Sequence, residues 1–503
     1  MTTWLTCTPP TPNGPLHVGH MSGPYIAADV LRRALAAQGE DVRLTTGMDD
    51  NQSYVPRRAW ADGSDPVEVA DRYTRSITTT WRDAGVDFDT VVLPRGEDYD
   101  ARVRSMFRAL VDVGAVVPRA TQLPYCEDCS RWLYEAYLNG ACPHCGSGTN
   151  GNACEQCCRP NACHDVVDPS CIRCGSPATI RPVTLLVLPL EPMRDDLTKY
   201  WDSVDMPPRL RAVCDAMAAD GLPEILVAHP SDWGVSVPVE GYEDHRIYVW
   251  LEMAEGYAVE RPTAPDGDVV GRPVQFFGID NGYFHAVLFP AVNLALGRHE
   301  LLAERFVVNE FFLLNGQKFS TSRQHAVWAE EFLPVAGRDL LRLHCMLRRP
   351  ATRQTDFTLQ DLARTEAVMD SWQRTFAQTV RLVGATSEPA AADPAPADVR
   401  RHARHAARAV DDIRAGLTLD GFDPAAAAAG LVELGERVAR LADEVAATAP
   451  GTPARAAAVA VLRETAEQFA DVAAPVVPDG AARLLAALRS GEVPRTKLFG
   501  LGA

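Results

Sequence analysis

The stretch Pro-Asn-Gly-Pro-Leu-His-Val-Gly-His-Met at residues 12–21 decides the fold of this chain, because it follows a short apolar segment and opens a long helical one. Residues 4–8 have the composition of a buried strand, and residues 16–37 carry apolar side chains at helical spacing. Residues 41–46 are typical of a second strand. Strand, helix and strand in this order predict a parallel doubly wound α/β unit, which binds ligands at the carboxyl ends of its strands.

A second motif, Lys-Phe-Ser-Thr-Ser at residues 318–322, lies far downstream. The chain has only three lysines, Lys199, Lys318 and Lys497, so a chance lysine in this motif is less expected than in a lysine-rich chain. In this order the two motifs resemble the ATP-handling signatures of class I aminoacyl-tRNA synthetases. The residues around the first motif resemble methionyl-tRNA synthetases in particular.

The resemblance implies an enzyme that activates an amino acid with ATP and releases pyrophosphate, with Mg²⁺ bridging the phosphates. His17 and His20 would lie in the first turn of a helix, whose N–H groups and dipole attract phosphate, and Lys318 would approach the β- and γ-phosphates. These three are the predicted catalytic residues. The predicted ATP-binding residues are Asn13, Gly19, Gly278, Asp280, Phe319, Ser320 and Ser322. The alternative is that the histidines only cap a helix and that Lys318 is a solvated loop residue.

One position departs from the family pattern. The second lysine of the family motif is Thr321 here. Lys318 would therefore carry the pyrophosphate charge together with Ser320 and Ser322.

Four Cys-x-x-Cys pairs occur in the middle of the chain: Cys126/Cys129, Cys142/Cys145, Cys154/Cys157 and Cys171/Cys174. Each pair can supply half of a tetrahedral zinc site, so the spacing predicts two Zn²⁺ ions. Disulfides are the alternative, and they are uncommon in a cytosolic enzyme. The insert resembles the zinc knuckles of methionyl-tRNA synthetases, and we expect nested pairing, in which the outer pairs share one ion and the inner pairs the other. Full cysteine ligation would make both ions structural.

The family resemblance also indicates an amino-acid pocket, with Asp49 as the partner of the substrate ammonium group. Asp50 beside it is the alternative. The predicted amino-acid-binding residues are Thr8, Pro9, Asp49, Trp250, Ala254, Tyr257 and His285. Glu255 replaces an apolar family residue; facing solvent it would have no consequence. Facing the pocket unpaired, it would favour a cationic or hydrogen-bonding substrate, so we expect a specificity other than methionine.

Length and charge limit the organisation of the chain. At 503 residues it is too long for one core. The net charge of −17 gives no global attraction to nucleic acid, so tRNA binding would need a local basic patch.

The sequence has no apolar run of membrane-spanning length and no secretory signal, which predicts a cytoplasmic enzyme without a membrane partner. The expected segments are two halves of a catalytic domain (1–113 and 229–310), a zinc-binding insert (114–228), a connecting region (311–357) and a helical bundle resembling an anticodon-binding domain (358–503).

The bundle lacks the asparagine and tryptophan residues with which methionyl-tRNA synthetases, the family that the chain resembles, usually read the anticodon. Residues 359–383 contain no asparagine, and residues 441–453 contain neither asparagine nor tryptophan. We therefore expect the acceptor to be a small molecule or carrier in natural-product biosynthesis, served by a separate partner enzyme. One alternative is a methionine–tRNA ligase whose divergent bundle uses arginines such as Arg400, Arg401 and Arg404. Another is a catalytically idle regulatory or RNA-binding relative.

Overall fold

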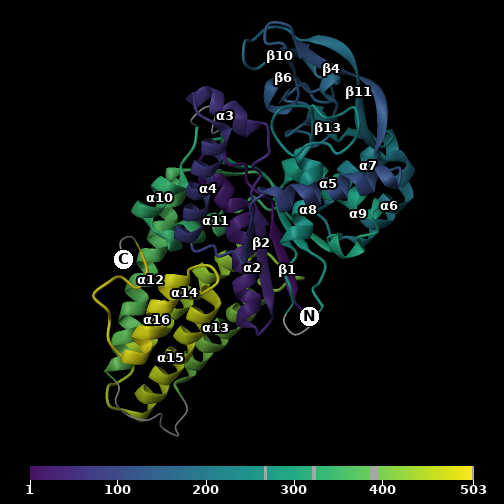
Figure 1. The fold of residues 1–503 in the computed structure, drawn as a ribbon. Coiled ribbons are helices and arrows are strands. Elements are labelled where there is room, and N and C mark those ends of the chain that lie inside the picture. The colour runs from purple at the N-terminus through teal and green to yellow at the C-terminus, as the bar shows by residue number, and fades with distance from the viewer. Residues whose placement is uncertain (265–268, 320–324, 386–394, 501–503) are drawn as a thin grey trace. The chain divides into compact units, whose positions relative to one another are not determined.

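The computed structural model describes residues 1–264, 269–319, 325–385 and 395–500 (Figure 1). The chain forms two compact units, and each unit is assembled from separated stretches of sequence. The first unit contains residues Met1–Pro15, Arg43–Thr78 and Phe88–Asn309. The second unit contains Leu16–Val42, Thr79–Asp87 and Glu310–Ala503.

The first unit is built on a parallel sheet with the strand order β16-β15-β1-β2-β3. Its strands are β1 (Thr3–Cys7), β2 (Val42–Gly47), β3 (Thr90–Val92), β15 (Val274–Gly278) and β16 (Arg305–Asn309). The pairs β1/β15, β15/β16 and β2/β3 are parallel. The chain begins in the middle of the sheet and adds strands on both sides, so the strand order reverses beside β1. Ligands of doubly wound sheets bind at this switch point, outside the carboxyl ends of the strands.

The helices of the first unit are α3 (Tyr54–Asp62), α4 (Pro66–Asp83, which runs on into the second unit), α5 (Glu97–Asp112), α6 (Arg194–Ser203), α7 (Pro208–Asp220), α8 (Val249–Glu260) and α9 (Phe289–Ala295). The cysteine-rich insert is mostly strands and tight turns. Its long strands β4 (Val117–Cys126) and β11 (Thr179–Pro189) pair antiparallel, flanked by β5 (Arg131–Trp132) and β12 (Glu224–Leu226). Shorter strands complete it: β6 (Leu138–Ala141), β7 (Gly148–Thr149), β8 (Asn152–Ala153), β9 (Pro160–Asn161) and β10 (Val167–Cys171). The hairpin of β13 (Ala228–Pro230) and β14 (His245–Ile247) follows.

The second unit begins with a helical run that changes its pitch. It consists of α1 (Val18–His20), a π-helical turn (Met21–Tyr25) and α2 (Ile26–Ala37). Pro24 lies inside the π turn, and Gly23 departs from helical geometry there. Proline removes a backbone donor and crowds the preceding turn, which accounts for the break in the α-helix.

The rest of the second unit is mainly helical. The strands β17 (Phe312–Leu314) and β18 (Gln317–Lys318) come before the helices α10 (Ala329–Ala336) and α11 (Arg338–Leu347), and β19 (Thr355–Phe357) comes after them and completes a small sheet by pairing with β17. The bundle helices α12 (Leu359–Gly384), α13 (Ala397–Ala415), α14 (Pro424–Ala447), α15 (Pro453–Ala473) and α16 (Pro478–Ser490) follow. Side chains of Thr358, Asp423 and Thr452 cap three of these helices by accepting backbone N–H groups. The predicted parallel α/β sheet, cysteine insert and helical C-terminal region are confirmed.

Arg342 on α11 ties three parts of the second unit together. Its guanidinium donates to the Asp29 carboxylate on α2 at 2.6 Å, and both side chains are fully buried. It also donates to the carbonyls of Ala84 and Gly85 after α4, at 3.2 Å each. Further bonds of 2.7 and 3.0 Å reach the carbonyls of 475 and 476, between α15 and α16. One arginine therefore fixes the helix that follows the His17 turn to the end of the bundle.

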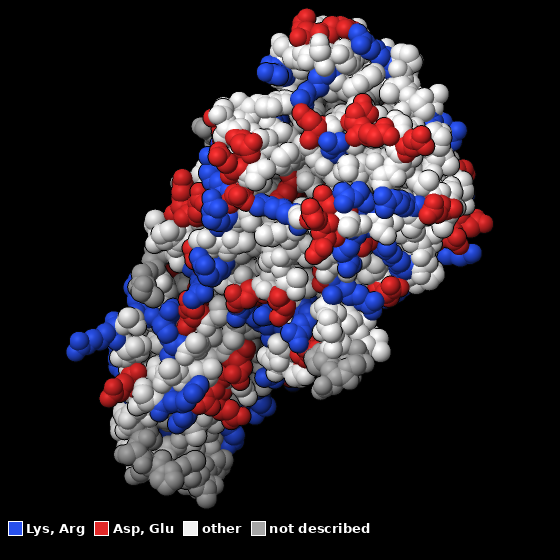
Figure 2. Space-filling model, viewed as in Figure 1, with Lys and Arg blue, Asp and Glu red and all other residues white. Residues whose placement is uncertain are grey.

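The charged residues are mixed on the surface. Figure 2 shows Lys and Arg interspersed with Asp and Glu on the face drawn, so the net charge of −17 does not form one continuous acidic field there. None of the helices in the described ranges combines the length and the apolar character needed to span a membrane.

Candidate functional site

His17 and His20 close the first turn of the helical run by capping each other. His17 is the N-cap; its Nδ1 accepts from the backbone N–H of His20, and the backbone N–H of His17 donates to Nδ1 of His20, both at 3.2 Å. The two rings stack with their centroids 3.5 Å apart. The turn is also held by backbone bonds from Val18 to the carbonyl of Val327 and from Ala329 to the carbonyl of Leu16, both 2.9 Å.

The capping bonds determine which ring nitrogen carries the proton. Burial, followed by the charge of Lys318, lowers the pKa of His20 to about 4. Burial, and next the neighbouring His20, lower the pKa of His17 well below its ordinary value. Both rings are therefore neutral at pH 7. Because Nδ1 of each ring accepts a hydrogen bond, the single proton must lie on Nε2, and each histidine presents an Nε2–H donor.

The second motif reaches the same turn. Phe319 stacks on the His17 ring with centroids 4.7 Å apart. A Cβ atom at Gly19 would lie 3.0 Å from Nδ1 of His17 and 3.2 Å from the Phe319 ring, so a larger residue would crowd both rings. Lys318 ends β18, and its ammonium group lies over the Phe311 ring, 4.3 Å from the centroid. Ser320, Thr321 and Ser322 lie outside the described residues.

Asp49, in the first unit, follows β2 and differs from neighbouring Asp50 in its charge partner. Its Oδ2 accepts from the Thr11 hydroxyl at 2.8 Å, whereas its buried Oδ1 has no hydrogen-bond partner within the described residues. Burial raises the pKa of the Asp49 carboxyl well above its ordinary value. Asp50 also has a buried Oδ1 without a hydrogen-bond partner within the described residues, but its other oxygen accepts from the Arg95 guanidinium, so its charge is already paired. Asp49 therefore offers one buried carboxylate oxygen to a ligand.

Aromatic rings surround His285 in the same unit. His285 stacks on Phe277 at 4.0 Å and meets the edge of Tyr257 at 5.7 Å. Its ring bonds to Oε1 of Gln275 through Nδ1 at 3.0 Å, and since an amide oxygen only accepts, Nδ1 must carry the proton. Nε2 of His285 is then a buried acceptor with no partner in the part of the chain that the structure describes. Burial lowers the pKa of His285 to about 3, so the ring stays neutral.

The remaining candidates are placed as follows. Trp250 stacks face to face on Phe284, with centroids 3.7 Å apart. Ala254 is fully buried on α8, and Thr8 and Pro9 are buried just after β1. Gly278 ends β15, where a Cβ atom would lie 2.5 Å from Oδ1 of Asp280, so a larger residue would displace the Asp280 side chain. Asn13, partly buried, lies in the loop before the histidine turn.

Several contacts at these positions were missed from the sequence. The Thr11 bond to Asp49 joins two segments that are distant in the sequence and meet only in space. The His285–Gln275 contact could have been found from the sequence, because a polar residue such as Gln275 inside the apolar strand β15 needs a buried hydrogen-bond partner. Trp328 lies beside the His17 ring at 6.4 Å, and no pattern in the sequence indicated this contact.

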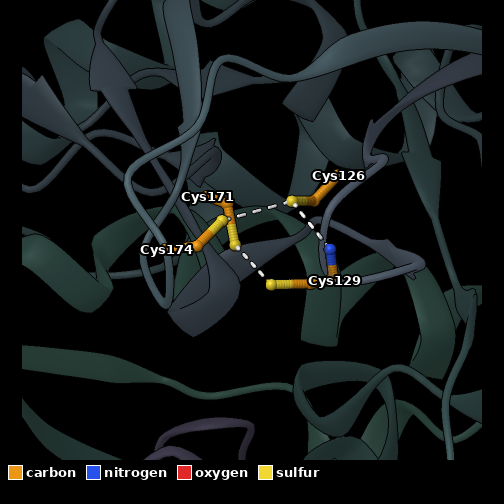
Figure 3. Close-up of side chains that lie close together, drawn as sticks. All are labelled: Cys126, Cys129, Cys171 and Cys174. Atoms are coloured by element: carbon orange, nitrogen blue, oxygen red, sulfur yellow. Dashed lines mark hydrogen bonds between the residues drawn. The ribbon is translucent and has the colours of Figure 1, made fainter.

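The cysteine pairs assemble in the nested order. Among the described residues, two groups of four sulfur atoms lie within 4.8 Å of one another: Cys126, Cys129, Cys171 and Cys174, and Cys142, Cys145, Cys154 and Cys157. In the first group (Figure 3) the Sγ atoms of Cys126 and Cys174 are 3.5 Å apart, and those of Cys171 and Cys129 are 3.9 Å apart. In the second group the corresponding distances are 3.9 and 3.7 Å. A tetrahedron of sulfurs around Zn²⁺, with Zn–S near 2.3 Å, has edges of about 3.8 Å. Both groups could hold a zinc ion.

The chain resembles known proteins over most of its length. The family model described as tRNA synthetases class I (M) matches residues 3–368. The methionine–tRNA ligase of Parabacteroides distasonis is 33% identical over 371 residues, which are 71% of this chain and 54% of that protein. The methionine–tRNA ligase of Thermoplasma volcanium is 30% identical over 377 residues, 72% of this chain and 69% of that protein. The chain thus spans about half the length of the Parabacteroides relative.

Solved structures agree in fold. Mycobacterium tuberculosis methionyl-tRNA synthetase bound by methionyl-adenylate superposes with a TM-score of 0.77 at 18% identity, covering 99% of this chain and 100% of that one. The ligand-free form of the same enzyme superposes with a TM-score of 0.67 at 18% identity, covering 99% of this chain and 94% of that one. At such low identity the likeness shows the fold alone.

These findings correct the expected acceptor. The prediction that a small molecule or carrier is favoured over tRNA, in natural-product biosynthesis with a separate partner enzyme, is wrong, because the similar proteins are methionine–tRNA ligases. The argument for a substrate other than methionine also loses its basis. Glu255 is buried but paired, accepting from Arg298 at 2.5 Å with Arg102 at 3.4 Å, so its carboxylate does not call for a cationic substrate. This chain belongs to the class I tRNA synthetase family, as a methionyl-tRNA synthetase-like member.

Proposed function

We propose that the chain is a methionine–tRNA ligase, which forms methionyl-adenylate from methionine and ATP and transfers the methionyl group to tRNA. The observation that carries this proposal is the identity of 30–33% to methionine–tRNA ligases over about 70% of the chain. Both motifs of the sequence fall inside the matched span, residues 3–368.

The histidine turn would bind the triphosphate of ATP. The Nε2–H groups of His17 and His20 donate to phosphate oxygens, and the start of the helical run adds backbone N–H groups and a favourable dipole. Lys318 leaves the Phe311 ring and neutralises the β- and γ-phosphates as pyrophosphate develops. Mg²⁺, when bound, bridges the phosphates and reduces their charge. Gly19, Phe319, Asn13, Gly278, Asp280, Ser320 and Ser322 remain proposed ATP-binding residues.

Asp49 would anchor the amino acid. Its buried Oδ1 accepts from the α-ammonium group, while Thr11 holds the other oxygen in place. Trp250, Tyr257 and His285 form the proposed wall around the side chain, with Thr8, Pro9 and Ala254 filling the space between them. A thioether suits such a wall, because sulfur packs favourably against aromatic rings.

Zn²⁺ is the ion proposed for both cysteine groups. The sulfur spacings fit a tetrahedral site, and four thiolates leave no position for substrate. The ions would stabilise the short strands of the insert, which contain few residues with which to build an apolar core.

Exchange of labelled pyrophosphate into ATP, followed by charging of a methionine tRNA transcript, tests the proposal. We expect exchange to depend on methionine among the twenty amino acids, and the tRNA to become methionylated. Exchange with another amino acid alone, or methionine-dependent exchange without charging, would contradict it. His20→Ala is a matched inactive control, because it removes one phosphate donor and leaves the amino-acid pocket intact.

A further inference from the structure

Helix α13 exposes a line of arginines at four-residue spacing. Arg400, Arg404 and Arg408 are all exposed, and they are called the α13 arginine stripe below. In an α-helix this spacing aligns the side chains on one face, with a positive charge roughly every 6 Å. The opposite face carries the buried residues Val399, Ala406, Val410 and Ile413, which pack in the bundle beside α14 (Figure 1). The stripe is therefore fixed toward solvent.

Two of the three charges of the stripe have no partner among the described residues, while the Arg400 guanidinium donates to the carbonyl of Ala395 at 2.7 Å. In the described ranges Arg404 and Arg408 have no ion-pair partner, unlike neighbouring Arg401, which pairs with Asp398 at 2.8 Å. Other exposed arginines of the bundle vary in this respect: Arg463 pairs with Glu467 at 3.0 Å, whereas Arg374, Arg381 and Arg489 also have no ion pair within the described residues. Arginines that are exposed and have no partner within the protein are available to an external anion.

The residues between the arginines allow close approach. Ala403 and Ala407 lie between successive members of the stripe, and Ala407 is exposed. Methyl groups at these positions let a sugar–phosphate chain come near the helix. Arginine also binds phosphate through two parallel N–H donors, which a flexible lysine does not.

We propose that the α13 arginine stripe contacts the phosphate backbone of tRNA. The inference rests on the proposed function and adds the surface through which the acceptor is held. Regular positive charge suits an anion that repeats along a chain, as phosphates do, better than a single carboxylate. In a chain with a net charge of −17, such a stripe also directs a polyanion to one face of the bundle.

The salt dependence of tRNA binding tests this contact. Each phosphate contact contributes about 0.7–0.9 to the slope of log affinity against log salt. Arg404→Ser/Arg408→Ser should reduce the slope by about 1.4–1.8, so between about 50 and 200 mM KCl the variant loses roughly 7- to 12-fold less affinity than the wild type. The matched control is Arg440→Ser/Arg463→Ser, which removes the same charge from paired positions on α14 and α15.

The measurements are the KM for a methionine tRNA transcript in charging at several KCl concentrations, and ATP–pyrophosphate exchange without tRNA. We expect a flatter slope for the α13 variant, a nearly unchanged slope for the control, and unchanged exchange for both. Equal slopes for all three proteins, or equal flattening in both variants, would overturn the inference while leaving the proposed function intact. Absence of charging by the wild type would overturn the proposed function and this inference with it.

Discussion

Replacement of Arg342 by methionine should destabilise the second unit far more than a matched change on the same helix. Methionine preserves much of the volume but removes the donors to Asp29 and to four backbone carbonyls. The Asp29 carboxylate would stay fully buried, and among the described residues the half-buried Arg33 would be left to pair with it at 2.7 Å. Breaking a buried pair in this way costs about 3–5 kcal/mol, a large part of the stability of a typical domain.

Arg338→Met is the control, because Arg338 lies one turn earlier on α11 and bonds to Asp479 at 2.7 Å at the surface, where the side chains are 39% and 35% exposed. A pair of this kind contributes about 0–1 kcal/mol. Urea unfolding followed by circular dichroism, with limited proteolysis to assign the transition to the second unit, measures both variants. Adding Asp29→Asn to Arg342→Met should recover part of the loss, since it removes a buried carboxylate charge that has lost its buried partner. If the free energies of unfolding of Arg342→Met and Arg338→Met differ by less than about 1 kcal/mol, the reasoning about this buried arginine is refuted.

Four further outcomes follow from the site and its surroundings. Burial raises the pKa of Glu260 to about 8 from an ordinary value of 4.5, so ionisation opposes folding and the free energy of unfolding falls as pH rises through this interval. Glu260→Gln should therefore be more stable than the wild type by about 5 kcal/mol at pH 9 and by about 1 kcal/mol at pH 5. An equal difference between the two proteins at both pH values, measured by urea unfolding, would count against this. Metal analysis should find two zinc ions per chain and one in Cys171→Ser; two ions in the variant would exclude Cys171 as a ligand. Lys318→Ala should slow adenylate formation about 100-fold with the KM for methionine nearly unchanged, and a full-speed variant would remove Lys318 from the mechanism. Asp49→Asn should raise the KM for methionine about tenfold or more, whereas an unchanged KM would argue against the ammonium anchor.

The elements that depend on local pattern could be predicted from the sequence. The expected strand at residues 4–8 corresponds to β1 (Thr3–Cys7), and the apolar spacing of residues 16–37 marked a real helical run. The π turn at Met21–Tyr25 was not expected, although Pro24 is the residue that breaks the pitch. Nested pairing of the cysteines came from the family resemblance, since spacing alone allows other pairings.

The contacts made through space could not be predicted in the same way. Nothing near Arg342 in the sequence indicates that its partners come from α2, the end of α4 and the turn before α16. The role of Glu255 could not be predicted either, because a buried carboxylate destabilises the fold when it is unpaired and is tolerated when an arginine such as Arg298 pairs with it. The inference about the acceptor failed for a related reason: missing family residues in the bundle do not reveal which other side chains contact the partner.

The interleaving of the two units has a consequence for synthesis on the ribosome. The histidine turn and α2 emerge early, but the segments that hold them, around Val327 and Arg342, are translated more than 300 residues later. At about 5–20 residues per second the nascent amphipathic helix waits roughly 15–60 s for its neighbours. During that time its apolar face is open to chaperones, and a chain that stalls before α11 lacks Arg342, which holds the Asp29 carboxylate of α2.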